Sequence, residues 1–243
     1  MHTEPLSVPP VRVALLGAGH LGKIHLKCLL ELPERFHVVG VYDPDPLALA
    51  KAVEVFGVPG FDQPEALMDL VDAVDIVAPT LSHYDLALMA LRRLKHLFIE
   101  KPVAGTPAQA LEMLNMAREA GVKAQVGHVE RFNPAIQTMR EKIAEGLLGN
   151  VFQIATRRQG PFPARISDVG VVKDLATHDI DLTMWVMQDV YQSISSQTGH
   201  RSGRQNEDLL VAIGKLKNGV IVNHLVNWMS PFKERNVTVI GSN

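Results

Sequence analysis

A run of three glycines is the first segment with the residue types that bind a nucleotide. It reads Gly17-Ala-Gly19-His20-Leu21-Gly22 and follows a short apolar stretch. Gly17 permits a tight turn, Gly19 lets a pyrophosphate approach the backbone, and Gly22 lets a helix pack closely on a strand. The pattern therefore predicts a dinucleotide-binding turn that leads into a helix, with a purely structural glycine turn as the alternative.

A carboxylate at the expected spacing strengthens this interpretation. Asp43 stands 21 residues after Gly22, where its oxygens can accept hydrogen bonds from the adenosine ribose diol. Pro44 follows it, rather than an arginine that could pair with a 2′-phosphate, so NAD is favoured over NADP. We expect the cofactor to contact Gly17, Gly19, His20, Leu21, Gly22 and Asp43.

A charged pair follows another apolar stretch, in Phe98-Ile99-Glu100-Lys101-Pro102. Open α/β sheets bind ligands at the carboxyl ends of their strands, so Lys101 is expected to face a crevice. Its charge can stabilise alkoxide character during a hydride transfer. A surface ion pair between Glu100 and Lys101 is the alternative.

Acidic residues flank a histidine in Asp174-Leu-Ala-Thr-His178-Asp-Ile-Asp181. Spacings of four and three predict that Asp174, His178 and Asp181 share one face of a helix. A carboxylate can then orient the imidazole for proton transfer. A structural histidine, a solvated face and a metal site are the alternatives, and the lack of a third convergent His or a Cys predicts no metal.

Two segments near the middle of the sequence contain several basic residues. We expect His128, Arg131, Arg158 and Arg165 to hold an anionic substrate, because guanidinium groups bind phosphate and carboxylate bidentately. Solvated surface groups are the alternative. The whole chain has 24 basic and 26 acidic residues, a net charge of −2, so no general positive field attracts nucleic acid or an anionic membrane.

Two kinds of element must position these residues. Strands are predicted at Val11–Leu16, His37–Tyr42, Ala73–Ala78, His96–Ile99 and Val122–Val126, and helices at Leu21–Glu31, Pro46–Phe56, Pro64–Leu70, Tyr84–Leu94 and Pro107–Ala120. This alternation predicts a doubly wound α/β dinucleotide-binding Rossmann domain over residues 1–127, with a parallel sheet.

The pattern changes after Gly127. Helices are predicted at Pro134–Gly146 and Val172–Met187, and strands at Asn150–Arg158, Val190–Thr198, Asp208–Leu216, Val220–Trp228 and Arg235–Ile240. Asn218-Gly219 is typical of a tight hairpin turn. We therefore expect residues 128–243 to form a substrate-binding and dimerisation α+β domain with a mostly antiparallel sheet.

Composition limits the class of protein. With 47% hydrophobic and 21% charged residues, the chain of 243 residues is typical of a globular protein. No run approaches 18 uncharged apolar residues, so no membrane partner is expected. The single cysteine, Cys28, is expected to be buried and favours a reducing compartment, which makes the cytoplasm the expected location.

Taken together and in order, these residues resemble the Gfo/Idh/MocA family of NAD(P)-dependent sugar and cyclitol oxidoreductases. The resemblance is carried by the glycine run with His25 three residues beyond it, Ala78-Pro79-Thr80 with His83, Glu100-Lys101-Pro102, and Asp174 with His178. It implies that Lys101 and His178 are catalytic, that Asp174 positions the substrate, and that Thr80, His83 and Glu100 line the cofactor cleft. Gly127–Pro134, Arg158–Pro161 and Asp174–Asp181 look most like UDP-N-acetylglucosamine 3-dehydrogenase-type members.

The resemblance sets the expected function. We expect an NAD-dependent oxidoreductase that transfers a hydride between nicotinamide and a secondary hydroxyl of a sugar or sugar nucleotide. An inositol or free-sugar dehydrogenase, and a catalytically inactive NAD-sensing or partner-binding protein, are the alternatives. A homodimer or homotetramer through the C-terminal sheet is expected. Family members continue beyond the strand at Arg235–Ile240, so the end at Asn243 predicts either a chain cut short or a sheet edge that pairs with another chain.

Overall fold

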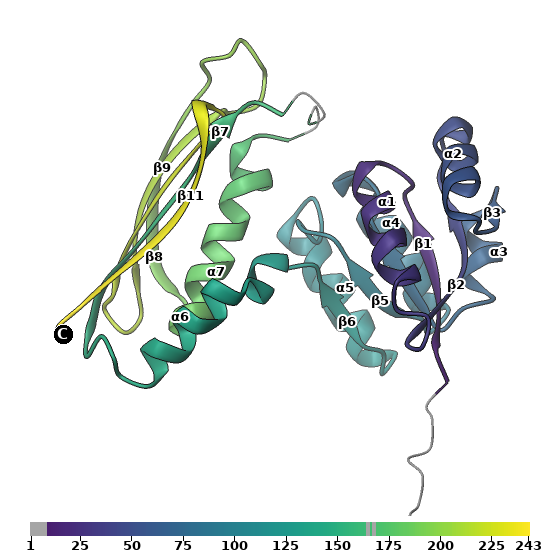
Figure 1. Ribbon diagram of the computed structural model, residues 1–243, viewed down its shortest axis with the longest axis horizontal. Helices are drawn as coiled ribbons and strands as arrows, with labels where there is room; N and C mark the ends of the chain where they lie inside the picture. The colour runs from purple at the N-terminus through teal and green to yellow at the C-terminus, as the bar shows by residue number, and fades with distance from the viewer. Residues whose placement is uncertain (1–8, 164–165, 167–168) are drawn as a thin grey trace, which may run out of the picture. The chain divides into compact units, whose positions relative to one another are not determined.

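The computed structural model describes residues 9–163, 166 and 169–243, and it divides into two compact units, one ending at Gly127 and the other beginning at His128. The first unit is built on a six-stranded parallel sheet with the order β3-β2-β1-β4-β5-β6 (Figure 1). Its strands are β1 (Val11–Leu16), β2 (Phe36–Tyr42), β3 (Gly60–Phe61), β4 (Ala73–Ile76), β5 (His96–Ile99) and β6 (Ala124–Val126). Its helices are α1 (His20–Leu30), α2 (Pro46–Phe56), α3 (Pro64–Met68), α4 (Thr80–Arg92) and α5 (Pro107–Glu119).

Both faces of this sheet are buried, as the apolar runs of its strands require. In β1, Leu15 packs into a core with α1 and α2, whereas Ala14 and Leu16 pack on the opposite face into a core with α3, α4 and α5. Successive side chains of a strand point to opposite faces, so one strand supplies both cores. The two cores hold the carboxyl ends of the strands in fixed positions.

The order of the strands reverses between β1 and β4, which are neighbours in the sheet. In doubly wound sheets, ligands bind beyond the carboxyl ends of the strands at such a switch point. The glycine run follows β1, and Thr80 begins the helix that follows β4. The sheet therefore brings both segments to its switch point.

The second unit contains a five-stranded sheet with the order β11-β7-β10-β9-β8. Its strands are β7 (Val151–Pro161), β8 (Tyr191–Gly199), β9 (Leu209–Leu216), β10 (Ile221–Asn227) and β11 (Met229–Gly241). All neighbouring pairs are antiparallel except β7 with β10. The helical segments are η1 (Val129–Phe132), α6 (Pro134–Ala144), η2 (Val172–Ala176) and α7 (Thr177–Met187). The predicted fold class, a Rossmann sheet with a mostly antiparallel α+β unit, is confirmed.

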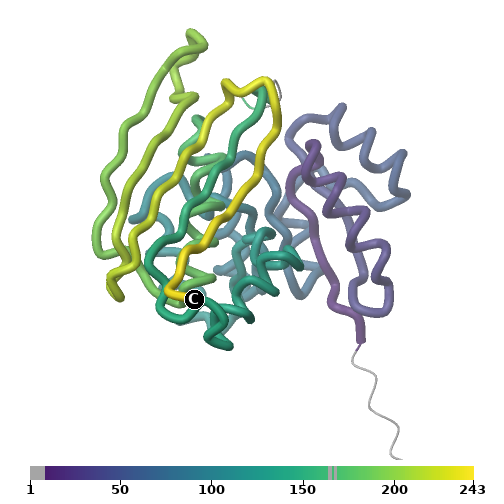
Figure 2. Tube along the Cα trace, turned by 60° about the vertical axis from the view of Figure 1, so that its left-hand side comes forward, coloured from purple at the N-terminus to yellow at the C-terminus, as the bar shows by residue number. Residues whose placement is uncertain are grey.

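One face of this second sheet carries the core. Ile154, Val222 and Leu216 pack against α6 and α7, and Leu210, Ala212 and Val226 pack against η2 and its flanks. Figure 1 shows α6 and α7 on the same side of the sheet. The opposite face exposes apolar side chains of β9 and β10, including Val211 (49%), Ile213 (63%) and Ile221 (45%). Figure 2 shows β11 beside β7 at one edge of the sheet and the β8–β9 pair at the other.

The hairpin between β9 and β10 forms at the predicted Asn218-Gly219. We expected both residues to have a positive φ, but of the two only Gly219 does. Gly219 has φ 96°, and its amide donates to the carbonyl of Leu216 at 3.0 Å. Among the described residues other than glycine, only Leu94 and Gln188 have positive φ, so Asn218 stays in an ordinary conformation. The Asn218 side chain accepts from the amide of Val220 instead.

Two other expectations were wrong. The single helix predicted over Val172–Met187 begins with a π-helical turn, Val172–Ala176, and becomes α-helical only from Thr177. Cys28 lies on the exposed side of α1 rather than in a core. In the described part of the chain, helices long and apolar enough to span a bilayer do not occur.

Candidate functional site

The glycine turn after β1 has a different physical reason for each glycine. Gly17 has φ 108°, and a Cβ there would lie 2.7 Å from the amide nitrogen of Ala78. A Cβ on Gly22 would lie 1.8 Å from the carbonyl oxygen of Gly17, so the helix touches the turn at this point. A Cβ on Gly19 would meet nothing within 4 Å. The turn is therefore closed on the protein side at Gly17 and Gly22 and open at Gly19.

Helix α1 begins directly in this opening. Gly19 is its N-cap, and no side chain caps the helix, so its first amides are left for another acceptor. His20 and Leu21 are the first two helical residues, and both are exposed. Free amides and the positive end of the helix dipole bind anions such as a pyrophosphate.

Asp43 lies beside the same turn. One oxygen of its carboxylate accepts from the amide of Ala18 at 2.6 Å, and the other accepts from the amide of Asp45 at 2.8 Å. These bonds hold the carboxylate at the end of β2, next to the glycines. A fixed negative charge there suits a ribose diol and repels a 2′-phosphate.

The segments that follow β4 and β5 are joined by His83. Its two ring nitrogens lie 2.8 Å from the carbonyl oxygen of Ala78 and 3.0 Å from that of Pro102. The ring is 1% exposed, so its position is fixed by these contacts and by packing. Thr80 is half-buried at the start of α4, and the Lys101–Pro102 peptide bond is cis. His83 thus fixes the segments that carry Thr80 and Lys101.

Glu100 pairs with His25, which the sequence analysis named only as part of the family resemblance. The ring of His25 donates to Asp75 over 2.9 Å, and its other nitrogen lies 3.4 Å from Glu100. Burial alone would lower the pKa of His25, but the hydrogen bonds and charges of Asp75 and Glu100 raise it to about 10. The imidazolium therefore fixes the Glu100 carboxylate beside Lys101. The Glu100 carboxylate pairs with the His25 ring through one oxygen and accepts from the Lys101 backbone amide through the other.

In the second unit, Asp174 and His178 lie on different kinds of helix. Asp174 belongs to the π-helical turn, and its amide donates to the carbonyl of Gly170 at 3.0 Å, whereas His178 lies in α7. Both residues are half-buried. A π-turn rotates the residues before it relative to an α-helix, so the even spacing argument does not extend back to Asp174. π-turns within helices are frequent at functional sites.

Asp181 is engaged with η1 rather than with solvent. Its Oδ2 accepts from Arg131 Nε at 2.8 Å, and His128 Nδ1 lies 3.4 Å from the same oxygen. Asp181 is 8% exposed. The structure therefore brings together His128, Arg131 and Asp181, three of the residues that the sequence analysis named, and the positive charge of Arg131 is already paired.

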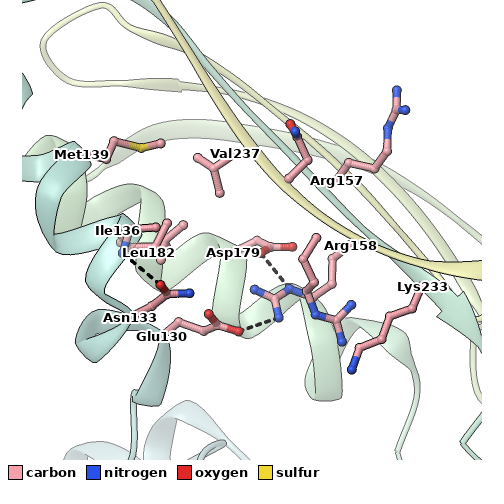
Figure 3. A pocket seen from close by; sticks show the side chains of 13 residues that line it. Glu130, Asn133, Ile136, Met139, Arg157, Arg158, Asp179, Leu182, Lys233 and Val237 are labelled. Atoms are coloured by element: carbon pink, nitrogen blue, oxygen red, sulfur yellow. Dashed lines mark hydrogen bonds and ion pairs between the residues drawn. The ribbon is translucent and has the colours of Figure 1, made fainter.

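Arg158 is paired more completely. Its guanidinium donates to Asp179 at 2.9 Å and to Glu130 at 2.8 Å, and the side chain is almost fully buried (Figure 3). Burial would lower the pKa of Arg158, but these two carboxylates raise it. Phosphate binding by Arg131 and Arg158 stays a prediction, and their internal partners favour a positioning role. Arg165 lies outside the described residues.

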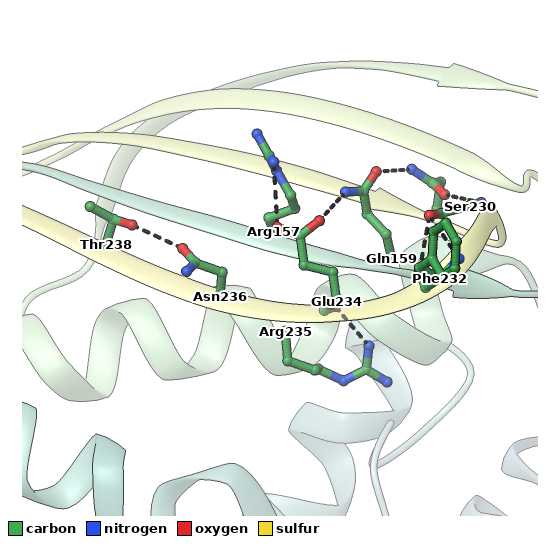
Figure 4. A network of polar contacts seen from close by, with 9 residues as sticks. Arg157, Gln159, Ser230, Phe232, Glu234, Arg235, Asn236 and Thr238 are labelled. Carbon is green, nitrogen blue, oxygen red and sulfur yellow. Dashed lines mark hydrogen bonds and ion pairs between the residues drawn. The ribbon is translucent and has the colours of Figure 1, made fainter.

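Sequence reasoning missed two cations that line the same region. Lys233 and Arg235 lie two residues apart in β11, a spacing that places them on one face of a strand. Arg235 pairs in register with Arg158 of β7. Figure 4 shows Arg235 directed away from the face that carries Glu234, Arg157 and Gln159. The alternation in Lys233-Glu-Arg235 was the signal that could have found them.

The residues present fit a dinucleotide in the first unit. The open space at Gly19, the uncapped amides of α1 and the fixed Asp43 carboxylate are the three features that such a group requires. Within the described ranges, no three His, Cys, Asp or Glu side chains gather as a metal ion would need.

Comparison with known families accounts for both units. Residues 11–128 match the model of an oxidoreductase family with an NAD-binding Rossmann fold, and residues 136–243 match the GFO/IDH/MocA C-terminal domain.

Individual relatives are sugar and cyclitol enzymes. The chain is 30% identical over 213 residues to UDP-N-acetylglucosamine 3-dehydrogenase of Acidithiobacillus ferrooxidans, covering 88% of this chain and 66% of that protein. It is 32% identical over 197 residues to the NAD(+)-dependent scyllo-inositol 2-dehydrogenase of Bacillus subtilis, covering 78% and 57%. The solved structure of the Acidithiobacillus enzyme superposes with a TM-score of 0.87 at 27% identity, covering 97% of this chain and 75% of that one. The chain thus spans less than two thirds of the length of these two curated relatives.

Proposed function

Because the chain belongs to the GFO/IDH/MocA oxidoreductase family, we propose that it is an NAD-dependent enzyme that transfers a hydride between nicotinamide and a secondary hydroxyl of a sugar. The observation that carries the proposal is the strand-end site of the first unit. There the open glycine turn, Asp43 and the segment with Lys101 all follow strands of one sheet. We propose a UDP-sugar as the substrate, with oxidation at the 3-position.

Each catalytic role follows from the chemistry of a side chain. Bound NAD would accept the hydride. Lys101 would donate to the hydroxyl oxygen and stabilise its developing negative charge. His178 would accept the hydroxyl proton as a general base, and Asp174 would position the substrate or the imidazole. That Lys101 and His178 act on one hydroxyl remains a prediction.

A second candidate is an inositol or free-sugar dehydrogenase. The scyllo-inositol 2-dehydrogenase relative, at 32% identity, supports it as well as the UDP-sugar relative supports the first. The two candidates differ in charge, since inositols are neutral and UDP-sugars carry a diphosphate. Side-by-side turnover of both substrates decides between them. If neither substrate nor any other sugar is turned over while NAD still binds, the NAD-sensing alternative replaces both.

The roles are tested by turnover and cofactor binding measured on the same variants. His178→Ala and Lys101→Met should each lower kcat by about 100-fold or more, as loss of a general base or an electrostatic stabiliser does. His178→Ala should keep its NAD affinity within about twofold, because general acid–base catalysis contributes at the transition state. His37→Ala and Lys123→Met, at exposed positions, are the matched controls. Unchanged turnover in either test variant would remove that residue from the mechanism.

We also propose that the chain forms a homo-oligomer through the open face of the second sheet. The exposed apolar side chains of β9 and β10 on that face support it. A cytoplasmic location is proposed from the single cysteine, which suits a reducing compartment.

A further inference from the structure

Lys233 and Arg235 lie on the boundary between two cavities of the second unit. The smaller, about 240 Å³, is lined by Asp174, Gln159 and Trp228 among others. The larger, about 460 Å³, is lined by Glu130, Arg158, Asp179 and the apolar residues of α6 and α7. Among the described residues, Lys233 and Arg235 alone line both. A ligand that extends from one cavity into the other must pass these two cations.

The charges at this boundary are not balanced. Arg158 and Arg235 face each other across the β7–β11 pair, and like charges directly opposite in a sheet repel. Both neighbouring carboxylates, Glu130 and Asp179, accept hydrogen bonds from Arg158. In the described part of the chain, Arg235 donates one hydrogen bond, to the carbonyl of Glu234, and Lys233 has no ion pair.

Arg235 is exposed at this boundary and has no carboxylate partner among the described residues. Burial lowers its pKa, and the charge of Arg158 lowers it further, while more distant carboxylates oppose this. An anion placed between Lys233 and Arg235 would neutralise the excess positive charge without disturbing the pairs of Arg158. Guanidinium and ammonium groups together bind phosphoryl oxygens well, since one offers a rigid fork and the other a point charge.

The two cavities differ in a way that suggests which group lies on each side. The cavity at Asp174 is smaller than the roughly 300–1,000 Å³ of a typical site for a drug-sized ligand, and it suits one polar ring. The larger cavity has a charged end at Arg158 and Arg235 and an apolar end at Ile136, Met139 and Leu182 (Figure 3). An apolar end suits a flat heterocycle better than a second sugar.

We propose that Lys233 and Arg235 bind the diphosphate of a nucleotide sugar, with the sugar beside Asp174 and the nucleoside toward Ile136 and Met139 in the larger cavity. The proposal rests on the proposed function and specifies its substrate class. It moves the phosphate contact away from Arg158, whose guanidinium instead fixes Glu130 and Asp179 around the site. A phosphomonoester could use the same two cations, so the test separates the two kinds of phosphate.

Kinetics separate substrate binding from chemistry. Lys233→Gln and Arg235→Gln should each raise KM for UDP-N-acetylglucosamine by about tenfold or more, because each removes one charge-assisted contact. Their kcat should stay within about threefold, and KM for myo-inositol, which has no phosphate, should not change. Arg235→Lys should recover part of the loss. Lys215→Gln, an exposed cation of β9 outside both cavities, is the control for the loss of one positive charge.

A glucose 6-phosphate arm identifies the phosphate. If the variants raise KM for glucose 6-phosphate by the same factor as for UDP-N-acetylglucosamine, the cations recognise a phosphomonoester and the diphosphate assignment is wrong. If only the UDP-sugar is affected, the assignment stands.

Direct binding makes the result independent of turnover. Titration calorimetry of UDP, with NAD saturating so that the glycine turn is occupied, should show an affinity that falls about tenfold in Lys233→Gln and Arg235→Gln and weakens with salt. Wild-type UDP binding through these cations without any sugar oxidation would keep the subsite and reject the proposed function. Sugar oxidation with unchanged KM and UDP affinity in both variants would reject the subsite and keep the function.

Discussion

At the scale of single residues, the glycines of the turn differ in what requires them: packing of the fold at one position and space for a ligand at another. Gly22 is a packing residue, because any Cβ there would collide with the backbone of Gly17. Gly19 has an ordinary φ of −64°, and open space faces it. Neither the turn nor the core requires a glycine at position 19. We propose that the absence of a side chain there serves a ligand that approaches the backbone.

This contrast predicts opposite outcomes for two alanine substitutions. Gly22→Ala should lower the free energy of unfolding by about 2–4 kcal/mol, since the backbone of the turn must shift. Gly19→Ala should change it by less than about 0.5 kcal/mol, yet weaken NAD binding by about tenfold or more, because its methyl group occupies the space for the pyrophosphate. Denaturant unfolding and NAD titration of both variants measure this. A Gly19→Ala protein with wild-type NAD affinity would contradict the placement of the cofactor.

At the scale of elements, the first unit could be predicted closely from sequence. The bounds predicted for β1, α2 and β5 match those observed, because apolar runs, the Asp45 cap before Pro46 and the turn residues all agreed. The family resemblance and the NAD cofactor class are confirmed by the family models. The two-residue strand β3 was missed, since Gly60–Phe61 is too short to show a periodicity.

The second unit was less predictable for a different reason. A π-helical turn differs from an α-helix by one residue per hydrogen-bonded ring, and no residue type marks it in a sequence. The partners of Arg131 and Arg158 come from η1 and α7, so their pairing depends on tertiary contacts. Sequence alone identified these arginines as cations but could not show that carboxylates already neutralise them.

One buried network of the second unit predicts a pH dependence. His224 of β10 contacts Thr156 of β7 through Nδ1 at 2.6 Å and Tyr191 of β8 through Nε2 at 2.7 Å. Burial lowers the pKa of His224 to about 4, from the ordinary histidine value of 6.5. His224 therefore binds a proton below about pH 6.5 in the unfolded chain but only below about pH 4 in the folded chain. The free energy of unfolding falls across this window as the pH drops.

The size of this effect can be isolated with one variant. Between pH 7 and pH 4, wild type should lose about 2–3 kcal/mol more of its unfolding free energy than His224→Gln, which has no group to titrate. His200→Gln, in an exposed loop, should behave as wild type does. Denaturant unfolding at a series of pH values measures the difference. Parallel curves for wild type and His224→Gln would show that the buried ring is not the source.

At the scale of the whole molecule, the second sheet has one covered and one open face. The open face presents Val211, Ile213 and Ile221 side by side on paired strands. Contiguous apolar patches on a sheet are typical of a protein–protein contact, and a twofold axis would place the same patch on both partners.

A charge in the centre of this face should therefore break the assembly. Ile213→Glu should shift the protein from a dimer or tetramer to a monomer, because two carboxylates would be buried against each other or against an apolar partner. Leu47→Glu, at a position of α2 that is 79% exposed, is the control and should not change the mass. Size-exclusion chromatography with light scattering reads out the result. Wild-type protein that is monomeric at high concentration would reject the oligomer.

The ring of His83 has a mechanical consequence for the first unit. Because its ring nitrogens lie at hydrogen-bond distance from the main-chain oxygens of Ala78 and Pro102, it links the segments that carry Thr80 and Lys101. We expect a displacement of the Thr80 segment on dinucleotide binding to be passed through this ring to the backbone next to Lys101. Cofactor binding and the alignment of the lysine would then be coupled through one imidazole.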